Sequence, residues 1–410
     1  MYRTYSNLYL FNPTSDLAIG NASPNWQPNK LLIKMETDLA TLPMFLANAD
    51  DVVLVEHLPT QKYLESIAKL GLDLPEFMKI EKALHTETSP FKNINALKPW
   101  GWSPAVHKLL APLKSKCSPA FQKSPVFSWS AGMRDLYSKK FALGIQQQLI
   151  REFPDTAFIL KELCGQVCYE QQQIEALISR WGNLMIKAPW SSSGRGLQPI
   201  TKTPVHPKVW EKILGIINDQ GYAIAEPFLD KQLDIAFQFE LRNGKISYLG
   251  ISNFMTDKKG QYTGNRLNGL PNEMDSALKT FVERLPGKII DPLIQVLEKS
   301  ELATGYEGNF GVDVLVYKTT DGQLAVNPCL EINLRQNMGL LALQLEKLLL
   351  PSQKALYQTW YGGGSSFCNF QSEMRKKYPP VIKNNKIASG FFPLTDATSE
   401  SKFGAYILAP

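Results

Sequence analysis

Two carboxylates and one amide lie where a predicted hairpin would bring them onto one face. In the segment 308–339, two β-rich runs flank the turn signal Asp321-Gly322. Pairing centred on this turn places Asp313 opposite Glu331, roughly 4.5–5.5 Å away, with Asn333 on the same face. Adjacent carboxylates repel each other unless a cation lies between them, and Mg2+ prefers such oxygen ligands. The hairpin therefore predicts a metal site, with a solvated strand face as the alternative.

A loop rich in serine and glycine follows a short predicted strand that ends at Lys187. Glycines let the backbone turn its N–H groups toward an anion, and Arg195 and the serine hydroxyls add further donors. The segment lacks the G-x-x-x-x-G-K-[ST] pattern, so it is not a Walker A loop. An ordinary hairpin turn is the alternative to a phosphate cradle. The residues assigned to this loop are Ser191, Ser192, Ser193, Gly194 and Gly196.

Two further segments place charged groups where a ligand could reach them. The predicted strand 222–228 contains Glu226-Pro227 near its end, and proline removes one donor from the ladder. Pairing should therefore stop there and leave the Glu226 carboxylate free. The predicted helix 131–153 carries adjacent lysines, Lys139 and Lys140. Lysines on a helix are usually solvated, so this pair alone predicts little.

A long polar stretch, 253–272, contains three basic residues among several glycines. These residues are Lys258, Lys259 and Arg266. A loop of this length is either disordered or functional. Its basic side chains favour the functional alternative, a lid that covers an anionic ligand.

The N-terminal part of the chain alternates short strands with helices. Strands are predicted at 8–11 and 51–56 and helices at 38–47 and 61–70, which is typical of an α/β domain. The loop after the first strand lies where open α/β sheets bind ligands, with a capped polar turn as the alternative. Its polar residues are Asn12, Ser15, Asp16 and Asn21.

The rest of the chain predicts a mixture of strands and helices. Two strands, 234–241 and 245–253, should form a hairpin. Two helices are expected within 272–302, broken near Pro286-Gly287, and a leucine-rich helix at 339–359. The segment 372–410 reads as a basic tail spotted with proline.

The composition is that of an ordinary globular protein and does not indicate binding to nucleic acid or insertion into a membrane. The 410 residues are 44% hydrophobic and 20% charged, with a net charge of +6 and no block of like charge. This mild excess suits small anions better than a nucleic acid. No stretch reaches the ~18 apolar residues of a membrane span, so we expect a cytoplasmic protein. Five cysteines and four scattered histidines predict neither disulfides nor zinc nor histidine catalysis.

Taken in order, these motifs resemble the ATP-grasp superfamily over roughly residues 131–350. The order is a lysine on a helix, Lys187 beside the serine and glycine loop, Glu226 at a hinge, then Asp313 followed by Glu331-x-Asn333. The resemblance implies an α/β and α+β fold, with an N-terminal α/β domain before two lobes built on antiparallel sheets. The implied divisions are 1–125, 126–225, 226–365 and a tail at 366–410.

The resemblance also implies roles for individual residues. ATP would lie between the lobes, with the serine and glycine loop closing over its phosphates. The Asp-Lys pair that is common in the family is absent at Lys139-Lys140, so either of these two lysines could match the family's lysine. The implied ATP-binding residues outside the loop are Lys139, Lys140, Lys187, Glu226, Phe228, Leu229 and Asp234. The implied metal ligands are Asp313, Glu331 and Asn333, and the implied catalytic residues are Arg335, Lys187 and Arg266.

The function implied by the resemblance is that of an Mg-ATP-dependent ligase. Such an enzyme joins a small carboxylic acid to an amine, or sometimes a thiol, through an acyl phosphate. A small-molecule kinase and a nucleotide-binding protein without turnover are the alternatives. The expected partners are small-molecule carboxylate and amine substrates, ATP and Mg2+, without nucleic acid or membrane. The assembly state is left open, with a homodimer as one form.

Overall fold

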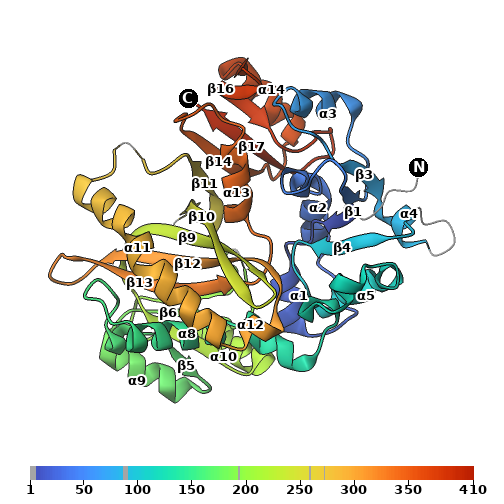
Figure 1. Cartoon of the computed structure of the whole chain (residues 1–410). Helices are drawn as coiled ribbons and strands as arrows, with labels where there is room; N and C mark the ends of the chain where they lie inside the picture. Colours follow the sequence, from blue (N-terminus) through green and yellow to red (C-terminus); the bar gives the residue numbers. More distant parts are fainter. Residues whose placement is uncertain (1–5, 86–90, 193, 258–259, 272) are drawn as a thin grey trace.

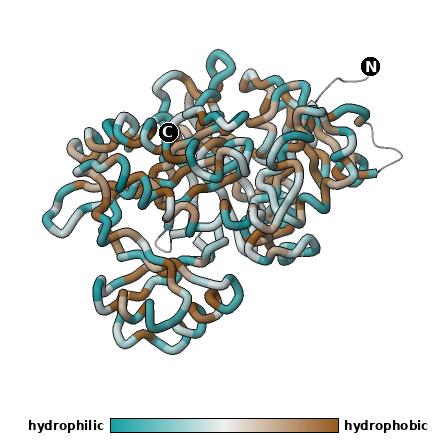
Figure 2. The backbone as a smooth tube through the Cα atoms, turned by 60° about the horizontal axis from the view of Figure 1, so that its bottom comes forward, coloured by the Kyte–Doolittle hydropathy of each residue, from teal (hydrophilic) through white to brown (hydrophobic). Residues whose placement is uncertain are grey.

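The computed structural model describes residues 6–85, 91–192, 194–257, 260–271 and 273–410, which form three sheets with helices packed on them (Figure 1). The expected fold class, α/β and α+β with antiparallel sheets in the two lobes, is confirmed. In Figure 2 the hydrophobic stretches run through the interior, and the hydrophilic ones lie mainly on outer loops. Among the described residues, every helix is too short or too polar to cross a membrane.

The N-terminal sheet is parallel and has the strand order β3-β2-β1-β4. Successive side chains of β1 point to opposite faces of this sheet and pack into two cores. Leu8 packs toward α5, and Tyr9 packs toward the C-terminal strands. Both faces are therefore covered, as the apolar run VVLV of β2 predicts. The strands are β1 (Ser6–Leu10), β2 (Val52–Val55), β3 (Glu76–Lys79) and β4 (Ile94–Pro99). The helices are α1 (Ser15–Asn21), α2 (Lys30–Asp38), α3 (Gln61–Ala68), α4 (Ile80–Leu84), α5 (Pro104–Leu109), α6 (Ala111–Lys114) and α7 (Pro119–Gln122).

The small lobe is a four-stranded antiparallel sheet covered by two helices. Its order is β5-β8-β6-β7, and Ile213 and Ile174 from the two helices pack against Ile186. Its elements are β5 (Gln166–Cys168), α9 (Gln171–Trp181), β6 (Leu184–Lys187), β7 (Leu197–Ile200), α10 (Pro207–Gln220) and β8 (Ala223–Pro227).

The largest sheet has nine strands in the order β13-β12-β9-β10-β11-β14-β17-β16-β15. The predicted hairpin is confirmed as β12 and β13, and Gly322 in its turn has a φ of +81°. Its strands are β9 (Asp230–Arg242), β10 (Lys245–Thr256), β11 (Tyr262–Leu267), β12 (Gly308–Lys318), β13 (Leu324–Asn333), β14 (Ala355–Tyr361), β15 (Val381–Lys383), β16 (Lys386–Pro393) and β17 (Phe403–Ala409). Its helices are α8 (Lys139–Glu152), α11 (Ser276–Lys299), α12 (Leu302–Gly305), α13 (Met338–Glu346) and α14 (Phe367–Lys377).

Two helix predictions are wrong at their ends or breaks. Residues 131–137 form a 3-10 turn, and α8 begins only at Lys139 because Ser138 caps it by accepting from the Phe141 N–H. The helix α11 continues through Pro286 and Pro292 although proline was expected to break it. Its buried apolar stripe against the large sheet offsets the roughly 3 kcal/mol that an internal proline costs.

Two segments in the N-terminal region and after residue 339 also differ from expectation. The helix expected at 38–47 lies earlier, at Lys30–Asp38, where Asn29 caps it, and the loop after β1 contains α1. The leucine-rich helix expected at 339–359 ends at Glu346 and gives way to β14. Pro351 follows that end, and proline cannot continue a helix.

The stretch 253–272 was predicted as a lid loop, and the structure corrects this. Strand β10 extends to Thr256, and β11 pairs with β10 on one side and β14 on the other. Backbone hydrogen bonding in the middle of the sheet therefore orders a polar sequence that carries no apolar strand pattern. Lys258 and Lys259 lie outside the described residues.

Residues 366–410 are not a tail, because they supply α14 and the strands β15, β16 and β17 of the large sheet. Phe391 and Ile407 are fully buried there, and Ile407 packs in the same core as Tyr9 of β1. Figure 1 shows the red C-terminal strands beside the blue N-terminal elements. The divisions at residues 125, 225 and 365 remain a prediction.

We expect Ile407→Ala to lower the free energy of unfolding by about 2–5 kcal/mol, because it opens a cavity in a closed core. The matched control is Ile382→Ala on β15, whose side chain is 37% exposed and should cost less than about 0.5 kcal/mol. Chemical denaturation measures both. Equal small losses would contradict the integral role of the C-terminal segment.

Candidate active site

A cavity of about 1210 Å3 lies where the small lobe, the large sheet and the N-terminal domain meet. Pro13 and Trp100 line it from the N-terminal domain, and aliphatic residues such as Met185 and Leu315 line it elsewhere. Most of the predicted site residues line this one cavity. They are Lys139, Lys187, Ser191, Ser192, Gly194, Glu226, Phe228, Leu229, Asp234, Asp313, Glu331, Asn333 and Arg335.

The two carboxylates of the hairpin are cross-strand partners, as the turn-centred register predicts. Asp313 pairs with Glu331, and Asn333 pairs with Gly311 two residues along the same ladder. Burial, and then the charge of Glu331, raise the pKa of Asp313 to about 7. Burial also acts to raise the pKa of Glu331, but Lys139, Lys187 and Arg335 together outweigh it and lower that pKa. The pair is therefore an anionic centre that requires nearby positive charge.

This centre has oxygen ligands that fit Mg2+ better than a softer metal. Among the described residues no three His, Cys, Asp or Glu side chains gather at one point, so protein carboxylates alone do not enclose a cation. Two carboxylates with an amide oxygen suit an ion that takes its remaining ligands from phosphate and water, as Mg2+ commonly does. The structure thus brings the two carboxylates together, whereas Asn333 Oδ1 accepts a hydrogen bond from Arg335 Nη2, and the metal ligands stay a prediction.

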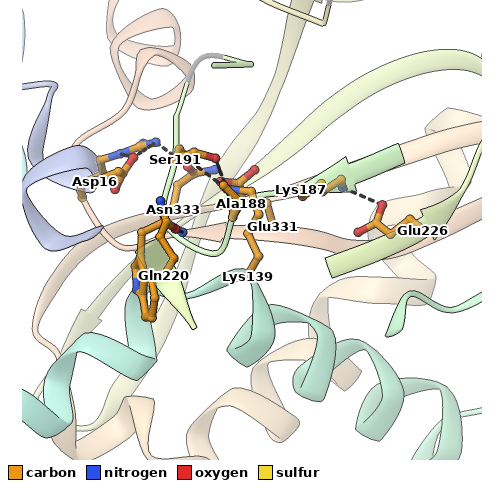
Figure 3. A network of polar contacts seen from close by, with 11 residues as sticks. Asp16, Lys139, Lys187, Ala188, Ser191, Gln220, Glu226, Glu331 and Asn333 are labelled. Carbon is orange, nitrogen blue, oxygen red and sulfur yellow. Dashed lines mark hydrogen bonds and ion pairs between the residues drawn. The ribbon is translucent and has the colours of Figure 1, made fainter. Parts of the chain in front are cut away.

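Lys139 contacts the anionic centre directly. Its Nζ lies 2.8 Å from Glu331 Oε1 and 2.8 Å from the carbonyl oxygen of Ser191, and its side chain is 7% exposed (Figure 3). Lys140 instead donates to Tyr169 Oη at 3.3 Å and lies over the ring of Tyr222, outside the cavity. The geometry separates two lysines that the sequence left equivalent, and it removes Lys140 from the predicted set.

Lys187 and Glu226 face each other across neighbouring strands of the small lobe. Their charged atoms lie 2.6 Å apart on β6 and β8, and both side chains are mostly buried (Figure 3). A buried pair of this kind holds each partner's rotamer. The lysine that we expected to face phosphate and the carboxylate that we expected at the hinge are therefore adjacent in this structure.

The serine and glycine loop is shaped by close contacts that only glycine permits. A Cβ on Gly196 would lie 2.2 Å from Ser191 Oγ, and one on Gly194, where φ is +72°, would lie 2.7 Å from the carbonyl oxygen of Gly260. The loop therefore meets the turn between β10 and β11. Ser192 Oγ is buried without a hydrogen-bond partner among the described residues. Ser193 lies outside the described residues, and Gly196 supports the loop without lining the cavity.

The expected hinge offers fewer backbone groups than the sequence suggested. The N–H of Phe228 donates to the carbonyl oxygen of Asn183 at 3.0 Å, and the Leu229 carbonyl accepts from the Lys231 N–H at 2.9 Å. Among the described residues, the Leu229 N–H and the Phe228 carbonyl have no backbone hydrogen-bond partner. Asp234 accepts from Lys231 Nζ at 2.6 Å.

Arg335 joins the hairpin to the N-terminal domain. Its Nε donates to Asp16 Oδ2 at 3.0 Å, and its Nη2 donates to Asn333 Oδ1 at 2.6 Å. Asp16 entered the sequence analysis only as one polar residue of the loop after the first strand. Its pairing with Arg335 spans 319 residues, so no local pattern could have identified it.

One predicted catalytic residue lies away from the cavity, and polar residues that were not predicted, such as Gln238, line it. Arg266 is held in β11 between Asn253 and Leu356 and does not line the cavity, because the expected lid is a pair of strands. Gln238 lines the cavity beside Gly311 and was missed. It shares a strand face with Asp234 four residues earlier, and that alternation was its only sequence signal.

The parallel N-terminal sheet and the two lobes with antiparallel sheets, which enclose the cavity, match the ATP-grasp fold. No protein-family model and no curated protein sequence matches the chain. Among solved structures, biotin carboxylase from Campylobacter jejuni, as a β,γ-ATP complex, is similar with a TM-score of 0.51 at 13% identity, covering 100% of this chain and 88% of that one. N5-carboxyaminoimidazole synthetase from Staphylococcus aureus is similar with a TM-score of 0.50 at 12% identity, covering 100% and 96%. At these identities the likeness establishes the fold alone.

We expect Lys139→Met to lower the free energy of unfolding by about 2–3 kcal/mol, because Glu331 then stays beside Asp313 without its cation. This is less than a sealed pair would lose, since the Glu331 side chain is 25% exposed. Lys140→Met is the matched control and should be nearly neutral. Urea denaturation of both variants measures the difference, and equal losses would contradict the assignment.

Proposed function

We propose that this protein is an Mg-ATP-dependent ligase that joins a small carboxylic acid to an amine or thiol through an acyl phosphate. The observation that carries the proposal is the cross-strand pair Asp313 and Glu331, with Asn333 and Arg335 beside it in the cavity. Phosphoryl transfer depends mostly on positioning and on neutralising phosphate oxygens, and this group of side chains can do both. The shared fold with biotin carboxylase supports the same reading.

The residues divide into those for the nucleotide and those for the transferred group. Lys139, Lys187 and the loop from Ser191 to Gly194 would bind phosphates, while Glu226 and the backbone near Leu229 would meet the base. Asp234 would hold the ribose. Asp313, Glu331 and Asn333 would hold Mg2+, which would neutralise phosphate oxygens when bound.

The proposed reaction consists of two successive displacement steps. A carboxylate oxygen of the acid attacks the γ-phosphorus of ATP, the bond to the bridging oxygen breaks, and ADP leaves. The amine nitrogen then attacks the carbonyl carbon of the acyl phosphate, phosphate leaves, and the nitrogen loses a proton. Arg335, two residues beyond Asn333, would stabilise the negative charge on the transferred phosphoryl group.

The deciding experiment incubates the protein with Mg-ATP and mixed pools of carboxylic acids and amines. Phosphate release and product mass are followed together. Phosphate appearing with an amide product supports the ligase, and a phosphorylated metabolite with ADP would replace it with a kinase. Nucleotide binding without turnover in any pool would leave a binding protein.

We expect Glu331→Gln to lower turnover about a thousandfold while nucleotide affinity falls much less, because the lost charge acts mainly on the transferred phosphoryl group. Glu301→Gln, an exposed glutamate before α12, is the control and should behave as wild type. Phosphate release gives turnover and calorimetry with Mg-ADP gives affinity. Unchanged turnover would refute the metal assignment.

We expect Lys187→Ala to raise the ATP concentration needed for half-maximal activity about tenfold, through loss of one phosphate contact. Lys208→Ala, an exposed lysine on α10, is the control. Initial rates across an ATP series measure both variants. A normal ATP dependence in Lys187→Ala would contradict the phosphate role.

A further inference from the structure

Asp16 supplies the N-terminal domain's charged contact with Arg335. Its Oδ2 lies 3.0 Å from Arg335 Nε and 2.9 Å from Nη2, and the two side chains are only 16% and 13% exposed (Figure 3). The same Nη2 donates to Asn333 Oδ1 at 2.6 Å. A continuous chain of polar contacts therefore runs from helix α1 through Arg335 to one of the proposed metal ligands.

The helix that carries Asp16 is held in place at its other end. Arg134 donates from Nε to the Ile19 carbonyl at 3.0 Å and from Nη2 to the Gly20 carbonyl at 2.7 Å. A Cβ on Gly20 would lie 3.1 Å from Trp190 Cβ, so α1 also packs against the start of the serine and glycine loop. The carboxylate of Asp16 is thus presented from a fixed support.

The segment beside Arg335 is fixed by the N-terminal domain as well. The N–H of Gln336 donates to the Trp100 carbonyl at 2.7 Å. A Cβ on Gly101 would lie 3.3 Å from Arg335 Cβ, so the two backbones approach closely. Both ends of the Asp16 to Arg335 contact are therefore set by packing, which favours a defined guanidinium orientation over a mobile surface pair.

We propose that Asp16 is a positioning residue for Arg335: it orients the guanidinium beside Asn333 and balances its charge in the nucleotide-bound ground state. The inference rests on the proposed function, because it assigns Arg335 to the transferred phosphoryl group. Because Asp16 holds it, the Arg335 guanidinium does not bind the ATP phosphates fully before the reaction begins. Its donors then contribute more to the transition state than to the ground state, which is the condition for faster turnover.

Removing only the charge of Asp16 has a distinctive consequence. In Asp16→Asn the amide keeps the size of the side chain and one acceptor, and the contact of Arg335 with Asn333 remains. The guanidinium then has only Glu331 and Asp313 as acidic neighbours, so the net charge facing a polyanionic ligand becomes more positive by one unit. Nucleotide should bind more tightly, whereas loss of a purely structural contact would weaken binding or leave it unchanged.

The test measures binding of the Mg2+ complex of AMPPCP, a non-hydrolysable ATP analogue, to the full-length protein by calorimetry. We expect Asp16→Asn to bind about threefold more tightly than wild type. In an Arg335→Gln background the same change should have no effect, because Asp16 acts through the arginine. Asp16→Glu restores the charge and should return the affinity toward wild type. Asp73→Asn, an exposed acid of the same domain, is the matched control.

The possible failures can be told apart. Weaker or unchanged binding in Asp16→Asn, or equal effects in both backgrounds, overturns the positioning role while nucleotide binding by the wild type stands. No binding of Mg-AMPPCP to wild type overturns the proposed function and this inference with it. Thermal unfolding on the same samples shows whether Asp16→Asn is folded. If it is not, the affinity of Asp16→Glu for Mg-AMPPCP decides: an affinity equal to that of wild type supports the positioning role, and a different affinity opposes it.

Discussion

The repulsion between two carboxylates on neighbouring strands is the constraint on which the rest of the site depends. The hairpin register fixes Asp313 opposite Glu331, so both side chains leave the same face of the sheet. Burial makes their shared charge more costly, as the raised pKa of Asp313 shows. Positive groups must therefore come from elsewhere in the fold, and the surrounding elements are arranged to supply them.

Each of the three parts of the molecule contributes to that balance. The large sheet holds the carboxylates, α8 places Lys139 against Glu331, and the small lobe brings a second lysine, Lys187, held by Glu226. The N-terminal domain contributes Asp16, which adds a negative charge next to Arg335. The charges thus alternate around the cavity, and an anionic ligand with Mg2+ would enter a site whose parts already hold one another in place.

The sequence predicted helices and strands well where a local residue pattern specifies them, and less well where tertiary packing determines them. The hairpin of β12 and β13, with alternating residues and a glycine turn, was predicted closely. The polar strand β11 was mistaken for a lid, because its order comes from pairing on both sides within the sheet. The helix α11 keeps two prolines because its buried stripe compensates for them, and a single segment does not reveal such compensation.

For the site, the sequence by itself determined which residues share the face of the hairpin, because strand alternation and turn position are local properties. It also located Lys187 beside its glycine loop. Only the tertiary structure decided that Lys139 and not Lys140 meets Glu331, across 192 residues. It alone paired Arg335 with Asp16, across 319 residues. The physical reason is that a side chain's charged partner is set by how distant elements pack, and residue spacing carries no record of that packing.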